Sequence, residues 1–324
     1  MIFFLLLSPG ISTMKIAIIG PGALGTLLAA SLIIKTNLKT PLDLWLLDHN
    51  PERAKYLDEK GLILEKGDQL LHCKIKATAD PKEIGPTDII ILCVKYPDFA
   101  AGLQQAAKLT HPESLLITLQ NGIGHLELLK AGKGSPAIVL GVTALGANLV
   151  SPGHVRFAGN GMTRIGFLKS ASFARSLHLA KVCNLLNDCG METAIVDDIL
   201  DYVWIKLLIN VGINALTAIH RCPNGGLLES RDTQNTLTAA VKEGEAVARA
   251  MGINLPEDPL AMTLDVCKKT ARNLSSMLQD INNRRPTEID SINGQIVAAG
   301  RKCDIPVPVN EELVQKVKEI EKNY

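Results

Sequence analysis

The 324-residue sequence lacks paired cysteines, an excess of charge of either sign and an apolar run as long as a membrane span. Its seven cysteines are odd in number and none falls in a C-x-x-C pair. This pattern favours reduced thiols over a disulfide framework and offers no zinc spacing. The formal net charge of +1 excludes a generic binder of polyanions, so we expect neither nucleic acid nor membrane as a partner.

What the chain does contain is typical of a globular protein of about two domains. Apolar residues make up 47% and charged residues 21%, which suffices for a sizeable core. The N-terminal stretch MIFFLLL has no preceding basic residue, unlike a signal peptide. We therefore expect residues 1–13 to be an extension outside the fold, with Met14 as the true start, rather than a membrane tether. A cytoplasmic location follows from this interpretation.

Short apolar strands alternate with helices in the first part of the chain and give way to helices alone after residue 195. The alternation predicts an α/β domain over 14–195 with a doubly wound parallel sheet, and the second part predicts an all-α domain over 196–324. The expected strands are 15–19, 42–47, 88–94, 114–119 and 137–142, separated by helices 24–34, 52–60 and 99–109. The expected helices of the second domain are 201–220, 232–251, 256–283, 286–301 and 309–322.

A glycine loop of the form G-x-G-x-x-G follows the first expected strand and opens the first helix. It consists of Gly20, Gly22 and Gly25, with Ala23 and Leu24 between the last two. The first glycine permits the tight turn, the second lets a pyrophosphate approach, and the third lets helix and strand pack closely. In this context the loop predicts a Rossmann-type dinucleotide site. The alternative is a glycine-rich turn without a ligand.

Residues at the ends of later strands bear on the choice of cofactor. Asp48 ends the second strand, where an acid binds the ribose hydroxyls of NAD, whereas Arg53 could reach the 2′-phosphate of NADP. Asp48 could instead be a helix cap. Lys95 and Asn121 follow two further strands and are placed to face a cofactor, although a solvated lysine and an ordinary Asn-Gly turn are the alternatives.

A polar row interrupts the apolar helix expected over 201–220. Lys206, Asn210 and Asn214 are four residues apart, and steps of four differ by only roughly 40° around a helix. The three side chains therefore share one face of a helix that is otherwise apolar all round. This arrangement predicts a polar lining of a binding site. A solvated stripe and a structural polar network between helices are the alternatives.

A second polar set follows in the same part of the chain. Asn273, Ser276 and Asp280 are spaced to share a helical face. Further on, Thr287 and Asp290 suggest a partial capping box, and Glu288 could be either a first-turn acid or a catalytic group. Reduction of a ketone by hydride leaves an alkoxide that needs a proton, and no histidine falls on either polar face. Lys206 is therefore the best-placed acid.

Together these motifs resemble the ketopantoate reductase (2-dehydropantoate 2-reductase) family. The glycine loop and the Lys206/Asn210 pair are shared with the wider 6-phosphogluconate and β-hydroxyacid dehydrogenases. More specific are Asn214-Ala-Leu-Thr-Ala and Cys222-Pro-Asn224-Gly. The most specific are the segments NLSSMLQD (273–280), TEID (287–290) and ING (292–294). The resemblance implies a Rossmann domain, a C-terminal domain like that of 6-phosphogluconate dehydrogenase, and a site between them.

The resemblance also implies roles for individual residues. Lys206 would protonate the keto oxygen of ketopantoate, and Glu288 would be the second essential residue, at a position that also borders the cofactor. The implied substrate-binding residues are Asn121, Asn210, Asn214, Asn224 and Ser276, and Lys95 and Asn121 would lie near the nicotinamide. The family's usual NADPH is favoured, because Arg53 could compensate for Asp48, which leaves NADH open. No metal is expected, and a homodimer remains open.

Two other functions stay open from the sequence. One is a sister dehydrogenase that acts on another 2-oxo or 3-hydroxy acid, because the polar row would be common to both enzymes. The other is a non-catalytic dinucleotide sensor, which would be expected to have lost the acid at position 206. The presence of Lys206 counts against the sensor.

Overall fold

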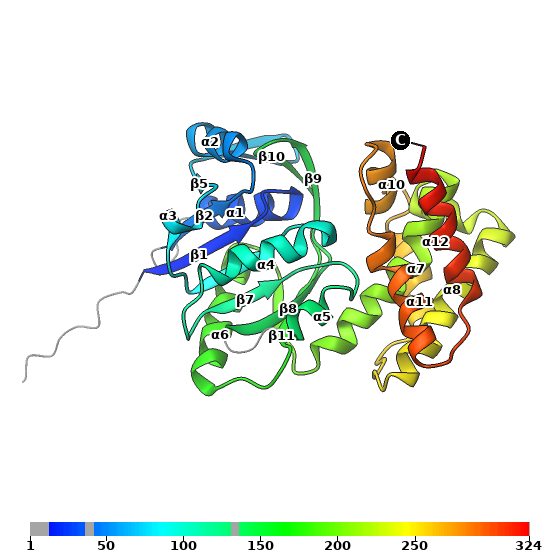
Figure 1. The fold of residues 1–324 in the computed structure, drawn as a ribbon. Helices are drawn as coiled ribbons and strands as arrows, with labels where there is room; N and C mark the ends of the chain where they lie inside the picture. Colours follow the sequence, from blue (N-terminus) through cyan, green and yellow to red (C-terminus); the bar gives the residue numbers. More distant parts are fainter. Residues whose placement is uncertain (1–12, 36–41, 131–135, 324) are drawn as a thin grey trace, which may run out of the picture. The chain divides into compact units, whose positions relative to one another are not determined.

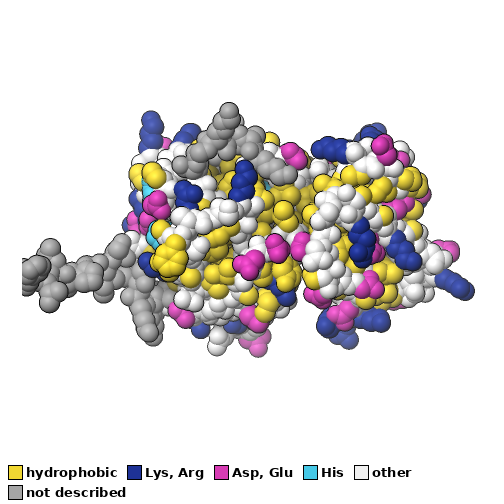
Figure 2. All heavy atoms as spheres, turned by 90° about the horizontal axis from the view of Figure 1, so that it is seen from below, with side chains coloured by type: hydrophobic (Ala, Val, Ile, Leu, Met, Phe, Trp, Pro, Cys, Tyr) yellow, Lys and Arg dark blue, Asp and Glu magenta, His cyan; other side chains and the backbone are white. Residues whose placement is uncertain are grey.

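The computed structural model describes residues 13–35, 42–130 and 136–323. These residues form two compact units (Figure 1). The first unit comprises 13–119 and 136–197, and the second comprises 120–130 and 198–323. The α/β architecture followed by a helical part, expected from the sequence, is confirmed. Lys/Arg and Asp/Glu side chains are interspersed on the face shown in Figure 2, as the small net charge leads one to expect.

An eight-stranded sheet forms the centre of the first unit. Its strand order is β12-β11-β8-β7-β6-β1-β2-β5, and all neighbours are parallel except β11 and β8. The strands are β1 (Met14–Ile19), β2 (Leu42–Leu47), β5 (Lys76–Thr78), β6 (Ile89–Leu92), β7 (Leu115–Thr118), β8 (Ala137–Thr143), β11 (Thr163–Phe167) and β12 (Thr193–Ile195). The chain reverses its direction of winding between β1 and β6, which is where sheets of this kind bind ligands.

A second, four-stranded sheet in the first unit was not expected from the sequence. Its order is β4-β3-β10-β9, and its strands are β3 (Leu62–Lys66), β4 (Gln69–Cys73), β9 (Gly146–Ser151) and β10 (His154–Gly159). Helix α1 (Ala23–Ile34) contacts β1 of the main sheet and all four strands of the second. Contact with both sheets explains why this helix is apolar all round, with Leu27, Leu28 and Leu32 buried.

Four further helices complete the first unit around the two sheets. They are α2 (Pro51–Lys60), α3 (Pro81–Ile84), α4 (Phe99–Ala107) and α6 (Phe173–Asp188), with a short 3-10 turn, η1 (Tyr96–Asp98), before α4. The ends of α2 and α4 lie within two residues of those expected, whereas α6 was not foreseen. Asn50 begins α2 by accepting a hydrogen bond from the backbone N–H of Arg53.

The second unit is helical and is built around α7 (Ile199–His220). Helices α8 (Arg231–Ala250), α9 (Pro259–Lys269), α10 (Ser276–Asn282) and α12 (Pro308–Glu321) pack against it. The unit also contains α5 (Leu126–Lys130), α11 (Asn293–Lys302) and two 3-10 turns, η2 (Asn224–Leu228) and η3 (Ile289–Ser291). α7 has the length and mean hydropathy of a membrane span, in contrast to the expectation from the sequence, but most of it is buried inside the protein.

Two of the expected long helices are wrong. The segment 256–283 is interrupted after α9, and the segment 286–301 contains a 3-10 turn before α11. The first break arises because the carbonyls of Ala271 and Asn273 accept backbone hydrogen bonds from the η2 segment. The hydroxyl of Ser275 then caps the new helix α10 at Leu278. Tertiary hydrogen bonds thus outweigh the local helical pattern.

The segment 120–130 follows β7 in the chain but groups with the helical unit. Gly122 has a φ of 74°, and a Cβ there would collide with the carbonyl oxygen of Ser291. The backbone N–H of Ile123 donates to the same oxygen at 3.3 Å. Only a glycine permits this close approach, which brings Asn121 to the turn that carries Glu288.

The glycine loop offers a matched pair of stability variants. A Cβ on Gly25 would collide with the backbone oxygen of Gly20, whereas one on Gly22 would come no closer than 4.0 Å to the Cys93 oxygen. Gly25→Ala should therefore lower the free energy of unfolding by about 2 kcal/mol or more, because backbone cannot yield, and Gly22→Ala should leave it nearly unchanged. Chemical denaturation of both variants measures this, and equal stabilities would contradict the packing described.

Candidate functional site

The glycine loop presents an open helix N-terminus at the carboxyl end of β1. Gly20 has a φ of 96°, which only glycine adopts readily, and its N–H donates to the Leu47 carbonyl at 3.0 Å. Gly22 is the N-cap residue of α1, with no side-chain cap and no acidic residue in the first turn. The first N–H groups of the helix are thus left for an anion. No protein atom requires glycine at position 22, so the space beside it suits a pyrophosphate.

Asp48 is buried at the end of β2 and is bound by Arg53. The Arg53 side chain contacts both carboxylate oxygens, with Nε on Oδ2 and one terminal nitrogen 2.7 Å from Oδ1. The backbone N–H of Asn50 also donates to Oδ1 at 3.0 Å. Hydrogen bonding to Asp48 raises the pKa of Arg53. The alternative of Asp48 as the cap of α2 is wrong, because Asn50 performs that role.

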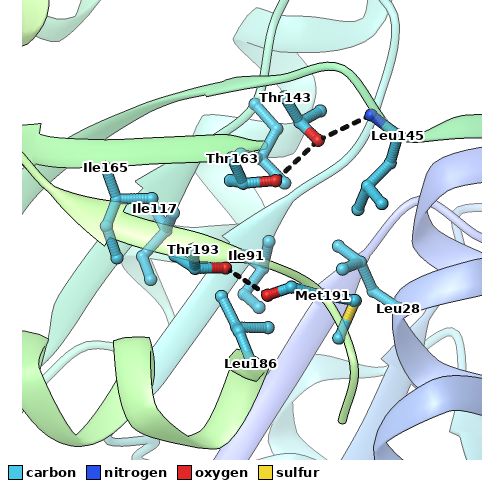
Figure 3. A pocket seen from close by; sticks show the side chains of 11 residues that line it. Leu28, Ile91, Ile117, Thr143, Leu145, Thr163, Ile165, Leu186, Met191 and Thr193 are labelled. Carbon is cyan, nitrogen blue, oxygen red and sulfur yellow. Dashed lines mark hydrogen bonds between the residues drawn. The ribbon is translucent and has the colours of Figure 1, made fainter. Parts of the chain in front are cut away.

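Two other features of the first unit have more limited roles. Lys95 is exposed just before η1, after β6. A small cavity of about 20 Å³ is lined mostly by apolar side chains, including Leu28, Ile117 and Met191 (Figure 3). It has room for about one water molecule. This cavity is far too small for a dinucleotide or an organic acid and is a packing void.

Helix α7 carries the polar row of the second unit, as its spacing predicts. Lys206 and Asn210 are half-buried, and Asn214 is buried. Burial lowers the pKa of Lys206 from 10.5 to about 8, and the negative charge of Glu288 opposes this by raising it. A lysine in this range can both hold a proton near neutral pH and release it, which suits a general acid.

Glu288 is only 8% exposed and receives a hydrogen bond from Asn121. The Asn121 Nδ2 donates to its Oε2 at 3.0 Å. These residues are 167 positions apart in the sequence, and both belong to the second unit. The capping box of Thr287 and Asp290 is wrong: the Thr287 hydroxyl accepts from the Ile289 N–H, and Asp290 pairs with Lys318. Glu288 therefore faces a lysine and an amide rather than serving as a first-turn acid.

Asn224 has a buried acceptor without a partner among the described residues. Its Nδ2 donates at 2.8 Å to the hydroxyl of Thr270, which in turn donates to the Val266 carbonyl. The Asn224 Oδ1 remains buried and unpaired within the part of the chain that the structure describes. Such an atom costs about 1–3 kcal/mol unless a ligand donates to it. The geometry therefore favours a ligand hydroxyl at this oxygen.

The remaining polar set from the sequence is not one helical face. Ser276 is exposed at the start of α10, whereas Asn273 lies before the helix, and Asp280 is buried within it. The buried hydroxyl next to Ser276 belongs to Ser275, which accepts a hydrogen bond from Thr217 at 2.7 Å. Sequence reasoning missed Ser275 and Thr270 as supports of the site, because their partners lie far away in the chain.

The second unit thus combines an acid of adjusted pKa, a carboxylate that stabilises its charged form, and several amides. These groups can bind a polar organic acid and deliver a proton to it. Among the described residues, no group of three or more His, Cys, Asp or Glu side chains is placed to hold a metal ion. Lys206 and the glycine loop lie in different compact units.

Comparison with known proteins agrees with this combination. The family model described as "Ketopantoate reductase PanE/ApbA" matches residues 16–170, and its C-terminal counterpart matches 198–321. The chain is 34% identical over 306 residues to the 2-dehydropantoate 2-reductase of Halobacterium salinarum, covering 94% of this chain and 98% of the relative. It is 31% identical to that of Vibrio cholerae over 315 residues, or 96% and 99% of the two chains.

Solved structures are similar over nearly the whole chain. A PanE/ApbA family ketopantoate reductase from Ralstonia eutropha has a TM-score of 0.85 and 28% identity, covering 96% of this chain and 99% of the other. A ternary structure of D-mandelate dehydrogenase with NADH and anilino(oxo)acetate has a TM-score of 0.85 and 26% identity, with the same coverage. The chain is an oxidoreductase that belongs to the ketopantoate reductase family.

Proposed function

We propose that this protein is a 2-dehydropantoate 2-reductase that reduces ketopantoate to (R)-pantoate with NADPH, as a step of pantothenate and coenzyme A biosynthesis. The observation that carries the proposal is the polar group of the second unit. There, Glu288 raises the pKa of a partly desolvated Lys206 and is itself bound by Asn121. The family membership supplies the substrate class, and the specific relatives of about a third identity support ketopantoate itself.

Lys206 acts as the general acid. Its ammonium donates a proton to the keto oxygen as that oxygen gains negative charge, and then recovers a proton from solvent. Glu288 favours the protonated lysine by its charge, and the Asn121 amide fixes the carboxylate. Asn210, Asn214 and Ser276 donate hydrogen bonds to the substrate's carboxylate, since amides and hydroxyls bind it without adding charge.

The first unit binds the cofactor. The loop from Gly20 to Gly25, with Ala23 and Leu24 at the helix start, would hold the pyrophosphate by backbone N–H groups. Lys95, which follows β6 of the same sheet, would border the nicotinamide end. When bound, the reduced nicotinamide supplies the hydride. Because Arg53 occupies both oxygens of Asp48, we infer that its remaining N–H groups bind the 2′-phosphate of NADPH.

Asn224 distinguishes ketopantoate from simpler 2-oxo acids. Its buried, unpaired Oδ1 requires a donor, and ketopantoate carries a hydroxyl at its far end. A site that depends on such a hydrogen bond rejects analogues that lack the hydroxyl, because the acceptor is then left buried and unpaired. The second candidate function is reduction of another 2-oxo acid, which the likeness to D-mandelate dehydrogenase favours.

Steady-state turnover of three substrates tests the proposal: ketopantoate, its analogue without the terminal hydroxyl, and phenylglyoxylate. We expect ketopantoate to exceed the analogue by about 10–100-fold in kcat/KM, as one buried hydrogen bond provides. Asn224→Ala should decrease the ratio of the two kcat/KM values, because it should lower kcat/KM for ketopantoate and leave kcat/KM for the analogue unchanged. A preference for phenylglyoxylate would select the mandelate-type function, and no turnover of any of the three would reject both.

The pH dependence of kcat/KM reports the pKa of the general acid. Reduction requires protonated Lys206, so the rate should fall as pH rises through about 8. Glu288→Gln removes the charge that raises the pKa of Lys206, and the alkaline limb of the kcat/KM profile should therefore move to lower pH by about one unit or more.

Lys206→Met should lose about 10²–10⁴-fold in turnover while still binding NADPH. A pH profile that is unchanged in Glu288→Gln would contradict this assignment.

Cofactor affinity tests the role of Arg53 without any substrate. Arg53→Gln should weaken binding of NADPH by about 10–100-fold, since it removes a charge-assisted phosphate contact. It should leave NADH binding equal or tighter, because Asp48 is then released to the ribose hydroxyls. Titration calorimetry with both cofactors measures this, with Lys55→Gln on the exposed part of α2 as control. An equal loss of affinity for NADPH and NADH would show that Arg53 only stabilises the structure and does not contact the 2′-phosphate.

A further inference from the structure

The 3-10 turn that carries Glu288 is fixed firmly on its C-terminal side. The Glu288 carbonyl accepts hydrogen bonds from the N–H groups of Ser291 and Ile292, at 3.0 and 3.1 Å. The Ser291 hydroxyl donates to the same oxygen at 3.0 Å. The Ser291 carbonyl in turn accepts from Ile123, next to the loop that carries Asn121. These bonds hold the backbone from Glu288 onward.

On the N-terminal side the chain arrives through an exposed stretch. Residues 282–286 are all exposed, and Pro286 has no N–H to donate. At Thr287 the chain becomes buried, and there the backbone N–H donates to Oε1 of Glu321 at 2.7 Å. Glu321 lies in the last turn of α12. This side chain fixes the backbone where it enters the interior, together with the bond from the Arg285 N–H to the Asp280 carbonyl at 2.9 Å and that from the Ile289 N–H to the Thr287 hydroxyl at 3.2 Å.

A second contact from α12 is weaker. Lys318 lies three residues before Glu321, on the same helical face, and its Nζ is 2.6 Å from Oδ1 of Asp290. Both side chains of this ion pair are about half exposed, so solvent screens it. The bond to Thr287 is made at the backbone of a buried residue, whose N–H would otherwise lose this partner. The hydrogen bond from Thr287 to Glu321 is thus expected to stabilise the turn more than the ion pair between Lys318 and Asp290.

We propose that Glu321 is a positioning residue, which holds the Glu288 carboxylate within reach of Asn121 through the backbone of Thr287. The catalytic consequence rests on the proposed function, whereas the effect on the protonation of Lys206 does not. Among the described residues Glu288 is the charged group that acts on Lys206, by raising its pKa. A displaced Glu288 would therefore leave Lys206 less protonated at neutral pH, and the protein would lose its acid.

Three variants of the full chain test the proposal. Glu321→Ala removes the acceptor, Glu321→Gln keeps an acceptor oxygen without the charge, and Glu319→Ala removes an exposed carboxylate from the same helix. The first readout is the pKa of Lys206. It is obtained from the pH dependence of the rate at which an amine-reactive acylating reagent modifies Lys206, followed by mass spectrometry. The second is the pH profile of kcat/KM with ketopantoate, and the third is Tm.

In Glu321→Ala we expect the pKa of Lys206 and the alkaline limb of kcat/KM to move together to lower pH, by up to about one unit, with up to about a fivefold loss of kcat/KM at pH 8. Glu321→Gln should restore both, and Glu319→Ala should match the unmodified protein. If Glu321→Ala lowers Tm but leaves the pKa of Lys206 unchanged, Glu321 is merely structural and the proposal is wrong. A pKa that moves in a protein without ketopantoate turnover would uphold the positioning role and reject the proposed substrate.

Discussion

A lysine half-buried in an apolar helix is the constraint on which the second unit depends. Removal of an ammonium from water is costly, and Lys206 keeps its proton near neutral pH because Glu288 opposes the effect of burial. The carboxylate is itself buried and in turn needs a donor, which Asn121 provides. One charge thus requires a chain of partners from α7, the turn before α11 and the segment after β7.

This requirement explains why the segment 120–130 belongs to the helical unit rather than to the sheet that precedes it. Gly122 allows the close approach to Ser291, and the approach places the Asn121 amide on Glu288. The acid, the carboxylate and the amides therefore form within a single compact unit, while the glycine loop and the Asp48–Arg53 pair form in the other. The polar groups around Lys206 and the glycine loop thus depend on separate cores.

The state of the buried polar groups separates structural from ligand-binding roles. Asp48 has both oxygens occupied by Arg53, so its carboxylate is already partnered within the protein. Asn224 is the opposite case, because its amide nitrogen has a hydrogen-bond partner among the described residues and its amide oxygen has none there. Gly22 adds a third kind of signal, a glycine that no protein atom demands. Only the tertiary structure reveals these differences, because the identity of a residue does not show which group it pairs with.

The sequence by itself determined the α/β and helical halves, the glycine loop, and the face shared by Lys206, Asn210 and Asn214, because these depend on local periodicity. It also placed Glu288 in a family motif, although its spacing alone left a helix start equally open. Only the tertiary structure decided the second sheet, the break between α9 and α10, and the pairings of Glu288 with Asn121 and of Thr287 with Glu321. Those contacts join residues distant in the chain, and their free energy outweighs local propensity where buried backbone groups require partners.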